Sequence, residues 1–130
     1  MMNSRTISVA IKRPPSEVYE FASNPGNLPQ WVRSFCQSVS KSGDDWFMET
    51  SDGRVGICFA ATNECGVLDH VVTLPDGRSI LNPMRVVPNG EGSEVLFTLF
   101  QLPEMSNDQF ARDAGMVEAA LNSLKAVLET

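Results

Sequence analysis

A long amphipathic segment near the C-terminus, residues 106–128, places the strongest constraint on the fold, because the rest of the chain must cover its apolar side. Its apolar residues recur every three or four positions, so they form one stripe on a helix of about five turns. Ser106 and Gln109 have the spacing of a capping box, which predicts where this helix begins. A helix with one apolar stripe must bury it against another layer of structure. The stripe comprises Phe110, Ala114, Val117, Leu121, Leu124 and Leu128.

That other layer is predicted to be an antiparallel sheet. Apolar residues alternate with polar ones in residues 5–12, the pattern of a half-buried strand. Turn signals such as Asp52-Gly53 and Asp76-Gly77 separate further strand-like runs, and such short connections exclude parallel neighbours. The sequence therefore predicts seven strands in one sheet. The six later strands are expected at residues 35–41, 46–51, 54–63, 67–74, 79–87 and 93–102.

Two short helices are predicted between the first and second strands. Pro15 suits the first turn of a helix, and Val18, Phe21 and Ala22 fall on one of its faces. Pro29 limits the next helix to a short turn that ends near Trp31. The expected order is strand, two helices, six strands and one long helix. With no repeat or linker in the sequence, we expect an α+β fold in a single domain, residues 1–130.

Residues 7–11, 14–21 and 24–31, together with the helix around Val117, Leu121, Leu124 and Lys125, resemble the START-related (SRPBCC) superfamily. More narrowly, they resemble its bacterial polyketide cyclase/dehydrase-like branch. The resemblance implies the helix-grip, or birch-pollen-allergen-like, fold: a curved seven-stranded sheet around a long C-terminal helix. Members share a ligand cavity but differ in activity. No family catalytic motif transfers to particular residues of this chain.

A long helix held by a curved sheet cannot contact it everywhere, so we expect a cavity between them. Its predicted ligand is a small hydrophobic molecule, such as an aromatic or polyketide-like compound. Phe97 and Phe100 lie on opposite faces of their strand, so only one of them can face the helix. The expected ligand-binding residues are Trp31, Trp46, Phe59, Asn82, Met84, Phe97, Val117 and Leu121.

Two residues are candidates for catalysis. His70 is the only histidine and has the side chain suited to proton transfer near neutral pH. Its neighbour Asp69 points to the opposite face of the strand, so the two should not form a dyad. The alternative for His70 is a hydrogen-bonded or half-exposed strand residue. Arg85 either binds a carboxylate or enolate oxygen inside the cavity, or points to solvent and pairs with an acid on a neighbouring strand. Glu49 is expected to face outward.

Charge and motifs exclude several classes of protein. Lys and Arg total 10 against 16 Asp and Glu, a formal charge of −6, which disfavours binding to nucleic acid or anionic membranes. No stretch is apolar enough to span a bilayer or to act as a signal peptide. Three cysteines without a C-x-x-C spacing favour reduced thiols, so we expect a cytoplasmic location. A metal-ligand set and a phosphate loop are both missing, so no cofactor is expected.

Three functions remain open. The first is binding of the small hydrophobic ligand. The second is a cyclase- or dehydratase-type enzyme, a lyase or isomerase, in which His70 or Arg85 would handle protons or an enolate. The third is an interaction module whose groove takes a helix or peptide of a partner protein. The sequence leaves the oligomeric state open and allows a homodimer.

Overall fold

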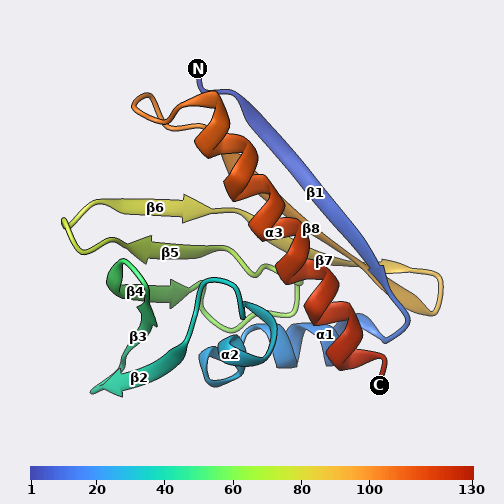
Figure 1. The fold of residues 1–130 in the computed structure, drawn as a ribbon. Coiled ribbons are helices and arrows are strands. Elements are labelled where there is room, and N and C mark those ends of the chain that lie inside the picture. The colour runs from blue at the N-terminus through green and yellow to red at the C-terminus, as the bar shows by residue number, and fades with distance from the viewer.

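The computed structural model describes residues 1–130 and has the predicted order of elements (Figure 1). One long helix lies along the first and last strands, while the middle strands extend to one side of it. The elements are β1 (Ser4–Ile11), α1 (Pro15–Ala22), the 3-10 helix η1 (Pro25–Asn27), α2 (Leu28–Trp31), β2 (Ser38–Ser42), β3 (Asp45–Thr50), β4 (Gly53–Phe59), β5 (His70–Thr73), β6 (Ser79–Asn82), β7 (Met84–Asn89), β8 (Gly92–Phe100) and α3 (Asn107–Leu128).

The strands are antiparallel, as predicted, but they form two ladders: β2-β3-β4-β5-β6 and β1-β8-β7. The expected strand 79–87 is divided at Pro83 into β6 and β7, which gives eight strands instead of seven. Proline has no N–H to donate to a ladder. The carbonyl oxygen of Pro83 still accepts from the Thr98 N–H, at 3.0 Å, so the chain passes from one ladder to the other without leaving the neighbourhood of β8.

The connection between β4 and β5 is longer than predicted, because β4 ends at Phe59 and β5 begins at His70. The Asn63 side chain organises this connection. Its Oδ1 accepts from the N–H groups of Cys65 (2.9 Å) and Val67 (3.0 Å), and its Nδ2 donates to the Val67 carbonyl at 3.0 Å. One amide side chain thus satisfies backbone groups that a regular strand would have paired.

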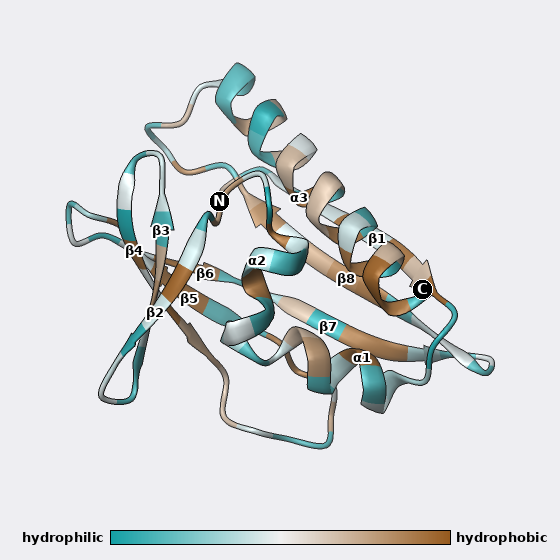
Figure 2. Cartoon of the chain, turned by 60° about the horizontal axis from the view of Figure 1, so that its bottom comes forward, coloured by the Kyte–Doolittle hydropathy of each residue, from teal (hydrophilic) through white to brown (hydrophobic).

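Strand alternation places one face of both ladders toward the helices. On β8 the buried residues are Ser93, Val95 and Phe97, and on β7 they are Met84 and Val86. Figure 2 shows hydrophobic stretches along β7, β8 and α3, where this core lies. We call this side of the sheet the inner face, and the solvent-facing side the outer face.

Helix α3 packs against β1, β8 and α2. The Ser106 side chain accepts from the Gln109 N–H at 3.1 Å, which confirms the predicted cap. The reciprocal half of the capping box is absent, because the Gln109 side-chain oxygen accepts from Arg112 instead of from the Ser106 N–H. The stripe is buried unevenly: Leu121 and Leu124 are fully buried, whereas Phe110 and Val117 are half-buried. None of the helices combines the length and apolar character needed to cross a bilayer.

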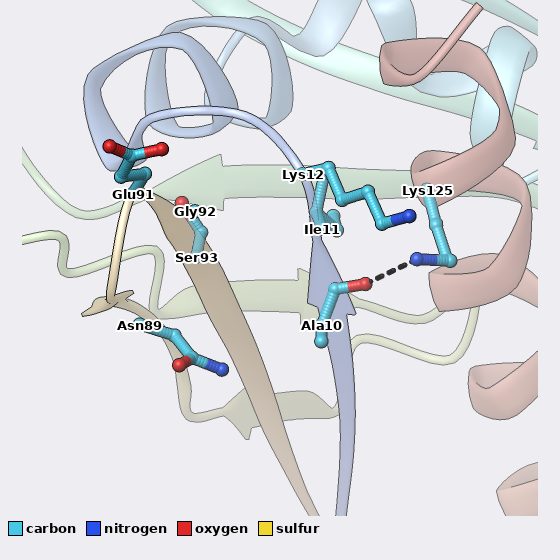
Figure 3. A pocket seen from close by; sticks show the side chains of 8 residues that line it. All are labelled: Ala10, Ile11, Lys12, Asn89, Glu91, Gly92, Ser93 and Lys125. Carbon is cyan, nitrogen blue, oxygen red and sulfur yellow. Dashed lines mark hydrogen bonds between the residues drawn. The ribbon is translucent and has the colours of Figure 1, made fainter.

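The C-terminal end of α3 is fastened to the end of β1 (Figure 3). Lys125 Nζ donates to the Ala10 carbonyl at 2.7 Å and to Glu129 Oε2 at 2.8 Å. The same Glu129 oxygen accepts from the Lys12 N–H at 2.8 Å. The hydrogen bond from Lys125, followed by that from Lys12, lowers the pKa of Glu129. This tether fixes the position of the helix on the sheet edge.

We predict that Gly66→Ala lowers the free energy of unfolding by about 3 kcal/mol or more. Gly66 has φ = +72°, and a Cβ there would overlap the Val86 carbonyl oxygen. Gly43→Ala is the matched control, because Gly43 has φ = +63° but no atom near its Cβ position. That control should cost about 1 kcal/mol, from the backbone conformation alone. Urea unfolding measures both, and equal losses would contradict the packing argument.

Candidate functional site

His70 lies on the inner face at the start of β5, buried among apolar side chains. Only 7% of it is exposed. Its ring centroid lies 5.1 Å from that of Phe59 on β4 and 5.7 Å from that of Phe97 on β8. Directly opposite it on β6 is Asn82. The only histidine of the chain therefore lies on the inner face between side chains of the two ladders.

The protonation state of His70 follows from its surroundings. Its Nδ1 lies 3.0 Å from the Leu68 carbonyl oxygen, which can only accept, so Nδ1 carries the proton. Burial lowers the pKa of His70, against smaller opposing effects of that hydrogen bond and of Asp69. The folded protein at neutral pH therefore holds a neutral imidazole whose Nε2 has a free lone pair.

His70 Nε2 makes no hydrogen bond with the protein, the single bond of the ring being the one to Leu68. Trp31 Nε1 is the one fully buried side-chain nitrogen or oxygen without a hydrogen-bond partner. Because Nε2 is also unpartnered and yet not fully buried, it borders accessible space on the inner face. An imidazole held this way can accept a hydrogen bond or a proton from a molecule on that face.

The inner face around His70 is only partly covered. Helix α3 packs on β1 and β8, beside the five-stranded ladder. Apolar side chains of β3, β5 and β6 consequently remain half-buried, as does Val117 on the N-terminal half of α3. We call the following half-buried residues the inner patch: Trp46, Phe59, Val72, Ile80, Asn82 and Val117.

Half of the residues predicted to bind a ligand belong to this patch. Trp46, Phe59, Asn82 and Val117 are half-buried on the inner side, and the Lys41 ammonium lies 5.6 Å from the centroid of the Trp46 ring system. The other four are buried in the hydrophobic core: Trp31, Met84, Phe97 and Leu121.

The sequence analysis missed Val72, Ile80 and the Leu68 carbonyl. Val72 and Ile80 are a cross-strand pair on the inner face. The sequence could have predicted both, because each lies two positions along a strand from His70 or Asn82 and so shares a face with it. The role of the Leu68 carbonyl had no signal, since it depends on the backbone conformation just before β5.

The position of Arg85 corrects the prediction that this residue acts in catalysis. It alternates with Met84 and Val86 on β7, so it lies on the outer face, where its guanidinium pairs with the Asp69 carboxylate. Asp69 also accepts from the Met84 N–H at 2.8 Å. Of the two arrangements open for Arg85, the structure has the one outside the cavity, and the arginine cannot reach His70 through the sheet. Glu49 faces outward as predicted and pairs with Arg54 at 2.8 Å.

Two surface hollows lie outside the space between the sheet and α3. One, of about 480 Å³, is bounded by the end of β1, the β7–β8 turn and Lys125 (Figure 3). The other, of about 580 Å³, lies between α1 and the β4–β5 connection and includes Tyr19 and Cys65. Neither is the closed cavity expected from the sequence. No cluster of three or more His, Cys, Asp or Glu side chains is placed to hold a metal ion.

Comparison with known proteins identifies the fold. No protein-family model matches the chain, and no curated protein matches it in sequence. Solved structures do match. The Aha1 dimer from Colwellia psychrerythraea is similar with a TM-score of 0.78 and 16% identity, covering 98% of this chain and 97% of that one. Ara h 8.0201 is similar with a TM-score of 0.74 and 10% identity, covering 98% of each chain.

A third similar structure is DynU16, a protein of the dynemicin biosynthetic locus, with a TM-score of 0.75 and 18% identity. The match covers 98% of this chain and 47% of DynU16. The chain therefore has the same fold as these proteins, the helix-grip or birch-pollen-allergen-like fold. At these identities the likeness establishes the fold and leaves the activity to the site.

We predict that His70 makes the protein less stable as the pH falls below about 6.5. Unfolded chains gain a proton on this histidine near its ordinary pKa of 6.5, whereas the folded protein gains it only at lower pH. In that window the unfolded state binds more protons, so the free energy of unfolding falls with a slope approaching about 1.4 kcal/mol per pH unit. Above the window the slope from this residue is zero.

Urea unfolding of wild type and His70→Phe at several pH values between 5 and 8 measures this slope. The variant has no histidine, so the difference in unfolding free energy between the two proteins should change only below about pH 6.5. Parallel profiles across the whole range would contradict a buried neutral His70.

Proposed function

We propose that this protein binds a small, largely apolar molecule against the inner patch, beside the N-terminal half of α3. One observation carries the proposal: half-buried apolar side chains share the inner face with a neutral histidine whose Nε2 has no partner. Folded chains normally cover such a surface and pair such an atom. A ligand that spreads over the patch would do both.

The fold supports the same conclusion at a coarser level. In a helix-grip protein the long helix and the curved sheet offer a concave apolar surface, the usual setting of a small-molecule site. DynU16, which shares this fold, comes from a biosynthetic locus. An aromatic or polyketide-like ligand would suit the aromatic side chains of the patch, because flat rings stack well on Trp46 and Phe59.

A second candidate function is proton transfer on the bound molecule. It is favoured by the neutral state of His70, since a general base must hold an unprotonated nitrogen at working pH. Arg85 plays no part in this version, because it faces outward. Binding alone requires only the patch, whereas catalysis additionally requires His70 as a base.

The first test is binding of the neutral apolar probe N-phenyl-1-naphthylamine, followed by its fluorescence and by native mass spectrometry. Wild type should bind one molecule. Val117→Trp places a larger side chain beside the patch and should weaken binding about tenfold. Leu81→Trp is the matched control, because Leu81 is 53% exposed on the outer face and should leave binding unchanged.

Absence of one-to-one binding in wild type would refute the proposal. Equal effects of the two tryptophan substitutions would also count against it, because the probe would then be binding elsewhere. Solvent extraction of the purified protein adds an independent readout: a co-purified apolar compound should be present in wild type and reduced in Val117→Trp.

A further inference from the structure

His70 and Asn82 are polar neighbours within an otherwise apolar inner patch. They are directly opposite each other in the β5–β6 ladder, so their Cβ atoms are about 5 Å apart on the same face. The patch members next to them along the strands, Phe59, Val72 and Ile80, carry no hydrogen-bonding group, and the indole N–H of Trp46 lies farther away on β3. Polar recognition around His70 therefore falls to these two side chains.

The two side chains differ in the hydrogen bonds that they can make. Nδ1 of His70 is committed to the Leu68 carbonyl, so Nε2 can only accept a hydrogen bond. Asn82 makes no side-chain hydrogen bond within the protein, and its amide can both donate and accept. A ligand that fits must present a donor to His70, and it gains a further bond by presenting an oxygen to Asn82.

We propose that the ligand of the inner patch is an apolar molecule carrying a neutral hydroxyl group, which donates its hydrogen bond to His70 Nε2 while the Asn82 amide donates to an oxygen of the same ligand. This inference rests on the proposed function and names the class of compound it takes. The site is thus selective for phenols and other hydroxylated apolar compounds over hydrocarbons and ethers.

Anionic ligands fit this arrangement poorly. A carboxylate or phenolate offers no hydrogen to Nε2, and the cation at the patch, Lys41, is on β2, three strands from His70. The neighbours of His70 on β4, β6 and β8 are Phe59, Asn82 and Phe97, which are uncharged. Asp69, the residue before His70, is paired with Arg85 on the outer face.

The test compares two probes that differ only in the donor: 2-naphthol and 2-methoxynaphthalene, both at pH 7. Wild type should bind the naphthol about five- to tenfold more tightly, the effect of one hydrogen bond to a group that is otherwise left unpaired. His70→Phe keeps an aromatic ring but has no acceptor, so it should bind both probes equally. Leu81→Ala, on the outer face, is the control and should keep the wild-type preference.

The imidazole itself provides a second readout that needs no variant. Because the chain has one histidine, its two ring nitrogens give an unambiguous pair of ¹⁵N signals. In the free protein the signals should be those of a protonated Nδ1 and an unprotonated Nε2. Addition of 2-naphthol should shift the Nε2 signal, and 2-methoxynaphthalene should leave it nearly unchanged.

The outcomes separate the two proposals. If neither naphthalene nor N-phenyl-1-naphthylamine binds, the site itself is wrong. If both naphthalenes bind equally to wild type, the patch binds apolar molecules but the selectivity for a hydroxyl is wrong. A protonated Nε2 in the free protein would overturn the selectivity as well, because the nitrogen would then be a donor.

Discussion

Burial of the apolar stripe of α3 on β1 and β8 is the interaction on which the rest of the architecture depends. The stripe is fully buried at Leu121 and Leu124, where the helix is also tied to β1 through Lys125 and Glu129. In its N-terminal half Ala114 is buried as well, but the larger Val117 and Phe110 are only half-covered. The helix is thus tied to the sheet at its C-terminal end, while part of its stripe remains as apolar surface that the protein does not cover.

The topology of the sheet also leaves apolar surface uncovered. Pro83 divides one predicted strand between two ladders, and α3 covers only the three-stranded ladder. The inner face of the five-stranded ladder is then left with half-buried side chains. His70 lies where the two ladders meet, between Phe59 of the five-stranded ladder and Phe97 of the three-stranded ladder. Uncovered apolar side chains and the one buried histidine therefore lie on the same part of the inner face. The neutral state of His70 is a consequence of this burial, and the Leu68 carbonyl determines that Nδ1 carries the proton.

Much of the fold could be predicted from the sequence, because it follows from local periodicity. The stripe from Phe110 to Leu128, the Ser106 cap and the short helix ending at Trp31 all depend on neighbouring residues. The division at Pro83 could not be predicted, since it depends on the contact with Thr98 on β8. The connection at Asn63 could not be predicted either, because an alternating pattern does not distinguish its local hydrogen bonds to Cys65 and Val67 from a continuing strand. For the site, alternation placed Asp69 and His70 on opposite faces correctly. It could not decide which face was inner, so Arg85 stayed ambiguous until Asp69 was seen beside it.

The division at Pro83 bears on how proteins of this architecture diverge. A residue with an N–H at this position would be able to pair, and the two ladders could then join into one continuous surface of different breadth. Chain length and the order of elements would stay the same. A single substitution at position 83 would therefore change the breadth of the inner face, where we propose that the ligand binds. Proteins of similar length and the same fold, at 10 to 16% identity, need not share a binding surface of the same breadth.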